Sequence, residues 1–239
     1  MTGQLNKQKV LVIGGSKYLG LAIARQASEA GAEVVIGARN LEQASQAAAQ
    51  LPMASAIHID IAEEDTIAAA ASQLKHVDHV VITASAHHNV PVKDLEHDKI
   101  VAAFEAKVIG PMLLAKHFAP ILSPTGSILL FSGIAAWKPS PGYSVMGVTN
   151  GAVAFLVAHL AKELAPIRVN AISPGITDSG TWNSLGAQDK KGLLESTAAS
   201  SLVGRAGTAA DIADTAIWLL GAGNVSGETI HVEGGARHA

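Results

Sequence analysis

The chain contains no cysteine, which excludes disulfide bonds and thiolate metal sites. Aromatic residues make up only 4% of its 239 residues, and 17 basic residues nearly balance 20 acidic ones, for a net charge of -3. A nucleic-acid surface needs clustered basic and aromatic side chains, and electrostatic attachment to a membrane needs excess positive charge. We therefore expect neither a nucleic acid nor a membrane as a partner.

Targeting segments and long apolar runs are also lacking. Residues Met1 to Gln8 are polar, and the apolar stretch from Val153 to Ala161 is interrupted by His159. Linkers, internal repeats and low-complexity segments are absent as well. We therefore expect a cytoplasmic protein with a single domain over residues 1–239.

Short apolar runs alternate along the chain with segments of helical pattern. Such alternation is typical of βαβ units, and it predicts an α/β fold with a doubly wound parallel sheet of about seven strands. The expected strands are 9–13, 33–37, 55–59, 77–82, 127–131, 167–172 and 229–232. The expected helices include 41–50, 63–74, 94–121 with a bend near Gly110-Pro111, 146–164 and 211–220. Residues 176–203 are expected to form a flap with a short amphipathic piece at 191–196.

The first strand is followed by a glycine-containing turn and a helical pattern. Gly14 and Gly20 in this turn allow the backbone to bend sharply and to approach a ligand closely. The amides that open the following helix favour a phosphate. The expected ligand is a dinucleotide, although glycines in a turn are often only a turn.

The whole chain resembles the short-chain dehydrogenase/reductase family. The resemblance rests on Gly14 to Gly20 and on four further motifs: HIDIAEED from His58, KELAPIRVNAISPG from Lys162, DIADTAIWLL from Asp211 and GETIHVEGG ending at Gly235. It implies a Rossmann-like fold and hydride transfer between a nicotinamide cofactor and a small-molecule substrate. It also implies a homodimer or homotetramer that packs through residues 103–118 and 151–164.

Arg39 follows the second expected strand, at the position that commonly selects between NAD and NADP. An acidic residue there would repel a 2′-phosphate, whereas Arg39 can bind it, and Lys17 adds a second positive charge. We therefore expect NADP(H); the less favoured alternative is that both residues are solvated surface charges. The family's loop TGxxxGxG has Tyr18 in place of its middle glycine, so this side chain must point away or reshape the approach. The cofactor-binding residues that the resemblance implies are Gly14, Ser16, Lys17, Tyr18, Leu19, Gly20, Arg39, Asp60, Ile61, Ala84, Ser85, Pro174, Gly175, Ile176 and Ser179.

The family's catalytic residues are a serine, a YxxxK pair and an asparagine. When the helix around Gly151 is aligned with the family, its four positions fall on Gly133, Met146, Asn150 and Lys107. A second alignment places Tyr143 at the tyrosine position, but the lysine is still missing. A positioned general acid contributes about 10²–10⁴-fold to rate, so ordinary ketone reduction is expected to be slow.

Three residues are candidates for a replacement site. Lys107 could hold an oxyanion or donate a proton, Ser132 follows a buried strand, and Tyr143 could donate a proton or form a pocket wall. The non-catalytic alternatives are that Lys107 is solvated or paired with Glu105, and that Ser132 only caps its strand. A substrate that is already electrophilic, such as an iminium or a conjugated system, needs no tyrosine.

Two other functions remain open: an NADP(H)-binding sensor or scaffold without turnover, and a non-redox enzyme derived from a reductase. His87 and His88 lack a third ligand at metal spacing, so no metal site is expected. Trp137 and Trp182 fit either a substrate pocket or a cover over the core.

Overall fold

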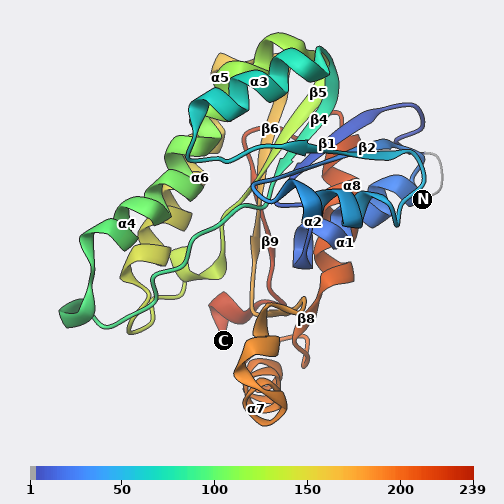
Figure 1. The fold of residues 1–239 in the computed structure, drawn as a ribbon. Coiled ribbons are helices and arrows are strands. Elements are labelled where there is room, and N and C mark those ends of the chain that lie inside the picture. The colour runs from blue at the N-terminus through green and yellow to red at the C-terminus, as the bar shows by residue number, and fades with distance from the viewer. Residues whose placement is uncertain (1–3) are drawn as a thin grey trace.

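The computed structural model describes residues 4–239 and contains a seven-stranded parallel sheet with helices on both faces (Figure 1). The strand order is β3-β2-β1-β4-β5-β6-β9, so the direction of winding reverses between β1 and β4. Open α/β sheets bind ligands at such a reversal. The prediction of a doubly wound sheet of about seven strands is confirmed. The strands are β1 (Lys9–Ile13), β2 (Glu33–Ala38), β3 (Ala54–His58), β4 (Val77–Ile82), β5 (Leu122–Phe131), β6 (Arg168–Pro174) and β9 (Thr229–Val232).

The helices form one layer on each face of the sheet. One core lies under α1 (Tyr18–Glu29), α2 (Leu41–Ala48) and α8 (Ala209–Gly221). The other lies under α3 (Glu64–Leu74), α5 (Gly110–Phe118) and α6 (Ser144–Glu163), and α4 (His97–Phe104) continues this layer (Figure 1).

Strand β1 shows why the strands read as continuous apolar runs. Val10 and Val12 pack into the core under α1 and α8, whereas Leu11 and Ile13 pack into the core under α5 and α6. Because both faces of the sheet are covered, both sets of alternate side chains must be apolar.

The expected long helix from residue 94 to 121 is interrupted. After a 3₁₀ turn, η1 (Val92–Asp94), and α4, a π-helical turn, η2 (Glu105–Ile109), precedes α5, and a further 3₁₀ turn, η3 (Ala119–Ile121), follows it. Pro111 has no amide hydrogen, and the amide of Gly110 donates to the carbonyl of Glu105, five residues earlier. The break therefore lies just before the predicted bend, and it turns Lys107 into the protein.

By length and composition alone, α6 is apolar enough to cross a membrane, with a mean hydropathy of 1.5 over its most apolar window. No such stretch was expected, because His159 interrupts the apolar run from Val153 to Ala161. One side of α6 packs on the sheet through Val153 and Val157, and the other exposes Val148 and Phe155, so α6 is apolar on both sides.

The segment expected to be an irregular flap is more regular than predicted. Residues 176–203 contain the short strand β7 (Thr177–Asp178), which pairs with β8 (Gly207–Thr208), a 3₁₀ turn, η5 (Thr181–Leu185), and a full helix, α7 (Ala187–Ala199). No residue of α7 is buried, and the helix projects from the body of the molecule (Figure 1). The amphipathic piece at 191–196 is therefore part of a longer, exposed helix.

Candidate functional site

The glycine turn lies at the carboxyl end of β1, packed against the end of β4. A side chain at Gly14, whose φ is +82°, would place its Cβ 2.6 Å from Thr83 Oγ1, and one at Gly20 would come within 2.7 Å of the same atom. Thr83 Oγ1 in turn donates to the carbonyl of Ile13. The turn therefore reaches this closeness to β4 only because both positions are glycine.

The turn leads into α1, whose start has no side-chain cap. Lys17 is the N-cap residue, its side chain makes no capping hydrogen bond, and the first turn contains no acidic residue. Ser16 and Leu19 lie in the same turn. An anion is the natural partner of such a helix end, so the geometry fits a pyrophosphate.

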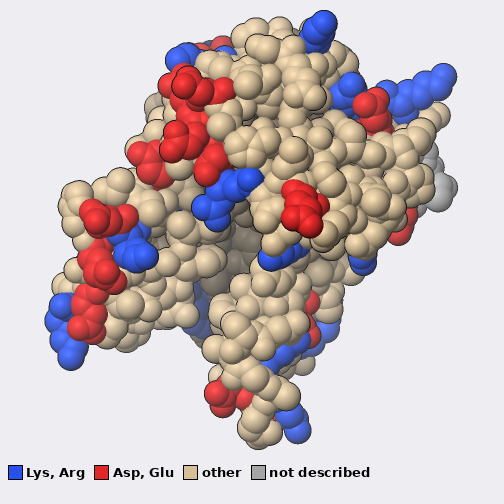
Figure 2. Space-filling model, viewed as in Figure 1, with Lys and Arg blue, Asp and Glu red and all other residues tan. Residues whose placement is uncertain are grey.

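Two positively charged side chains lie near this helix end. Lys17 and Arg39, which follows β2, are exposed, and neither forms an ion pair with another residue between 4 and 239. Figure 2 shows one face of the molecule, hollowed between the body and the projecting flap, with Lys and Arg side chains at the rim of the hollow. The chain thus has free positive charge available to a phosphate.

The residues that follow β3 and β4 lie at the same edge of the sheet. The Asp60 carboxylate accepts from the amide of Ala62 at 3.1 Å, so it stabilises its own turn and keeps one oxygen free. The side chain of Ile61 is buried in the core, which leaves its backbone at the edge. Ala84 is partly buried and Ser85 is exposed.

The segment after β6 leads from the sheet into the flap. Pro174 ends β6, and a Cβ at Gly175 would lie 2.8 Å from the Cβ of Glu233, so the backbone is tightly fitted there. Ile176 and Ser179 are partly buried, and the Ser179 hydroxyl is 3.0 Å from that of Thr181. All the predicted cofactor residues therefore lie at or beside the carboxyl ends of β1, β2, β3, β4 and β6.

Lys107 is the buried cation of the site. Its side chain is 8% exposed, and Nζ donates to the carbonyl of Phe131 at 2.8 Å and to that of Ser132 at 3.4 Å. Burial lowers the pKa of Lys107 to about 8. The ammonium has three protons, and the third has no acceptor among the described residues. The alternative of a solvated lysine paired with Glu105 does not match this geometry.

Ser132, Gly133 and Asn150 fit together beside Lys107. The Ser132 hydroxyl donates to the backbone carbonyl of Asn150 at 2.7 Å. A Cβ at Gly133 would lie 2.7 Å from Asn150 Nδ2, so the carboxamide occupies the space that a larger residue at 133 would need. Asn150 Oδ1 is buried and accepts no hydrogen bond within residues 4–239, which marks an unsatisfied acceptor.

The remaining polar candidates are Tyr143, His87 and His88. Tyr143 is partly buried at the start of α6, where it is the N-cap residue. Partial burial and the charge of Lys107 lower the pKa of His87, whereas His88 is buried and its Nε2 accepts from the amide of Glu96. Among residues 4–239, no three His, Cys, Asp or Glu residues are grouped as a metal site would need.

Trp137 and Trp182, the two tryptophans considered for a substrate pocket, both contact other parts of the protein. Trp137 packs edge-on against His231, with ring centroids 4.5 Å apart. Trp182 Nε1 donates to the carbonyl of Thr177 at 3.0 Å and so ties η5 to β7.

Known proteins are similar to this chain over nearly its whole length. A family described as enoyl-(acyl carrier protein) reductase matches residues 15–237. The chain is 31% identical to short-chain dehydrogenase/reductase ATR9 of Stachybotrys chlorohalonatus, with 96% of each chain covered. This protein belongs to the short-chain dehydrogenase/reductase family.

Two solved structures show how closely the family's fold is kept. A small-chain dehydrogenase solved in complex with NADPH is 31% identical, with a TM-score of 0.86 and coverage of 98% of this chain and 100% of that one. The MalC reductase/Diels-Alderase of Malbranchea aurantiaca is 25% identical, with a TM-score of 0.92 and 99% of both chains covered. The predicted family membership is confirmed.

Sequence reasoning missed two features of the site. The fit of Asn150 against Gly133 joins a helix to the end of a strand, and the only signal in the sequence was the pair of replaced family positions. The contact between Tyr18 and Gly180 joins the glycine turn to the flap, and no local pattern indicates it.

Proposed function

We propose that the protein is an NADP(H)-dependent oxidoreductase that acts on a small organic substrate through an active site without the family's serine, tyrosine and lysine. The family, the glycine turn, the free charges of Lys17 and Arg39, and the NADPH complex of a relative support the cofactor. When bound, NADPH supplies a hydride. The chain's own residues must orient the acceptor and manage its charge.

The buried ammonium of Lys107 is the observation that carries this proposal. It lies at the carboxyl end of β5, and one of its protons is uncommitted among the described residues. A carbonyl oxygen that gains negative charge as hydride arrives would be stabilised there, because a buried cation acts more strongly than one in water. A pKa of about 8 also lets Lys107 donate that proton near neutral pH.

The charge of Lys107 distinguishes between the two kinds of electrophilic substrate, a cationic iminium and a neutral conjugated carbonyl. Two positive charges about 5 Å apart repel by about 3 kcal/mol at an effective dielectric constant of about 20. Lys107 therefore disfavours a cationic iminium and favours a conjugated carbonyl. The description of the matching family, an enoyl reductase, names this chemistry.

Ser132 and Tyr143 have lesser roles in this proposal. The Ser132 hydroxyl already donates to Asn150, so it positions the start of the site rather than a substrate. Tyr143, partly buried at the start of α6, forms a wall of the substrate pocket.

The loss of NADPH absorbance at 340 nm, measured with 2-cyclohexenone and with cyclohexanone as substrates, tests the function. We expect turnover of the conjugated ketone only, with a rate that falls above pH 8 as Lys107 loses its proton. Lys107→Met should abolish turnover but keep NADPH binding, and Lys99→Met, which removes an exposed lysine of α4, is the matched control. NADPH binding without turnover of any conjugated carbonyl would favour a sensor or scaffold.

A non-redox reaction on the bound ligand is the second candidate. It is favoured by the name of the MalC reductase/Diels-Alderase, which combines reduction with a cycloaddition on the same fold. Product formation from a diene and a dienophile without loss of NADPH would identify it.

We also propose a homodimer or homotetramer in the cytoplasm. Apolar side chains are exposed along one side of the molecule, on α4, η2, α5 and α6, at Val101, Ile109, Met112, Val148 and Phe155. Sedimentation should show an oligomer that Phe155→Glu dissociates, and a wild-type monomer would contradict this assembly.

A further inference from the structure

The ring of Tyr18 connects the glycine turn to the flap. A Cβ built at Gly180 would lie 3.2 Å from Tyr18 Cδ1 and 3.5 Å from Cε1, so the ring lies against the backbone of residue 180. Gly180 lies within the flap and is the N-cap residue of η5. The ring thus spans the gap between the loop after β1 and the loop after β6.

This contact is made at a cost in backbone conformation. Tyr18 has φ of +51°, in the left-handed region that disfavours residues other than glycine by about 1–2 kcal/mol. Its side chain is still 50% exposed, so burial in the core does not offset the strain. Residue 18 thus keeps a backbone conformation typical of glycine, and in this conformation its ring contacts Gly180.

The end of the flap is bonded to the body, since Ser201 Oγ donates to the carbonyl of Gly234, whereas its helix is flanked by glycines. Positive-φ glycines stand at Gly180, at Gly186 just before α7, and at Gly204 beyond the flap. Lys190 pairs with Asp178 at 2.8 Å, within the same segment.

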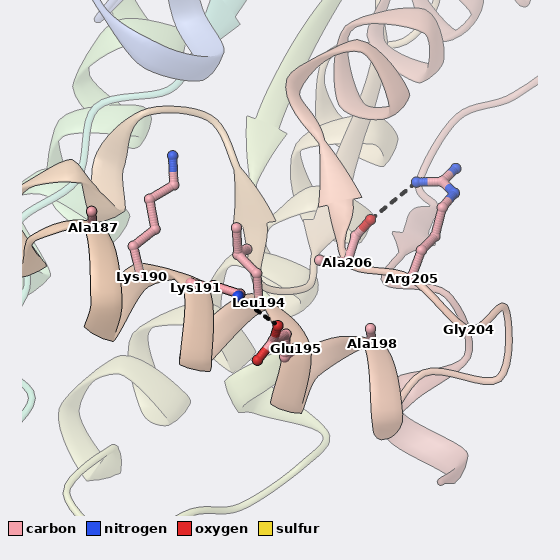
Figure 3. Close-up of a pocket in the computed structure, with 9 residues that line it drawn as sticks. All are labelled: Ala187, Lys190, Lys191, Leu194, Glu195, Ala198, Gly204, Arg205 and Ala206. Carbon is pink, nitrogen blue, oxygen red and sulfur yellow. Dashed lines mark hydrogen bonds and ion pairs between the residues drawn. The ribbon is translucent and has the colours of Figure 1, made fainter.

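One side of α7 faces a groove. A groove of about 500 Å³ separates α7 from the segment 204–206 (Figure 3). Its lining residues are Ala187, Lys190, Lys191, Leu194, Glu195, Ala198, Gly204, Arg205 and Ala206. Glycine hinges around a helix over a hollow are the features of a segment that moves as a unit.

We propose that Tyr18 is a positioning residue for cofactor retention, whose ring holds the flap hinge at Gly180 against the phosphate-binding turn. This inference rests on the proposed binding of NADP(H) at the start of α1. A dinucleotide bound at that helix end would lie beside the contact, so we expect it to leave faster when the ring no longer holds the flap. The contact uses ring carbons, so the hydroxyl is not needed.

Release of NADPH from the binary complex tests this role. Stopped-flow fluorescence, with excess NADP⁺ as the displacing ligand, gives the dissociation rate without any substrate. We expect Tyr18→Gly to release NADPH about three- to tenfold faster, the range that the loss of an aromatic contact implies. Tyr18→Phe should match the wild type. Amide exchange across residues 181–199 of the complex should rise in Tyr18→Gly alone.

A double-mutant cycle separates the contact from general strain. Gly180→Ala and Gly186→Ala both place a side chain at a positive φ, but only residue 180 touches Tyr18. Faster release should therefore be non-additive between Tyr18→Gly and Gly180→Ala, and additive with Gly186→Ala. The proposal is overturned if Tyr18→Gly releases NADPH at the wild-type rate, or if Tyr18→Phe releases it as fast as Tyr18→Gly. Failure of the wild type to bind NADPH would instead overturn the proposed cofactor.

Discussion

The buried charge of Lys107 should make the stability of the protein depend on pH in the alkaline range. The ordinary pKa of lysine is 10.5, and burial lowers that of Lys107 to about 8. Below pH 8 both the folded and the unfolded chain carry the proton. Between pH 8 and 10.5 the unfolded chain binds more protons, so the free energy of unfolding rises with pH. The lowered pKa therefore destabilises the fold fully below pH 8, and this effect is gone above pH 10.5.

The size of the effect follows from the two pKa values. At about 1.36 kcal/mol per pH unit, the difference between about 8 and 10.5 corresponds to about 3 kcal/mol. Lys107→Met removes this burden, but it leaves the carbonyls of Phe131 and Ser132 without their donor, which costs about 1–3 kcal/mol for a well-made bond. At pH 7 the two effects oppose each other, so the variant should lie within about 2 kcal/mol of the wild type.

Urea unfolding of the wild type and of Lys107→Met between pH 7 and 10.5 measures the effect. Across this range the wild type should gain about 3 kcal/mol of unfolding free energy relative to Lys107→Met. The other titrating groups are shared by the two proteins and cancel in the difference. Lys99→Met, at an exposed position of α4, should show no such trend. A difference that stays constant would mean that Lys107 is not held in the buried position described, and the proposed oxyanion site would lose its basis.

Three further predictions concern the glycines and the cofactor charge. Gly20→Ala should lower the unfolding free energy by about 2 kcal/mol or more, since its Cβ would lie 2.7 Å from Thr83 Oγ1, and an unchanged melting temperature would contradict the close packing of the turn. Arg39→Ala should reduce the preference for NADPH over NADH by about tenfold or more in a thermal-shift titration, and an unaltered preference would refute its role. Gly133→Ser should be destabilising alone and tolerated together with Asn150→Ala, which calorimetry of both variants can check.

The sequence was most informative where a residue type is imposed by sterics. Val10 and Leu11 had to be apolar because the sheet is covered on both faces, and Gly14 and Gly20 had to be glycine because Thr83 leaves no room for a Cβ. Constraints of this kind leave a local pattern that can be read without knowledge of distant parts of the chain. The fold and the parallel sheet were predictable for this reason.

Helix α7 was missed because it forms without a buried face. Nine of its thirteen residues are good helix formers, but Gly192 interrupts them and no apolar stripe runs along the segment, so hydrophobic periodicity does not indicate a helix of this length. The sequence indicated Lys107 as a candidate, but its hydrogen-bond partners were not predictable, for another reason. The π turn that directs its side chain toward β5 depends on packing between segments distant in the sequence, and Pro111 indicates only that the helix is disturbed nearby.

The two ends of the proposed site differ in how they can change. At the phosphate end a side chain at Gly14 or Gly20 would collide with backbone or with Thr83, so the shape of the turn permits little besides glycine. At the chemical end the fit is between side chains, where Asn150 fills the space beside Gly133. Such a pair can be exchanged only together, because a larger residue at 133 requires a smaller or displaced one at 150. A scaffold of this kind retains its cofactor while its chemistry changes, and restoration of the family's serine alone should disrupt the site rather than reactivate it.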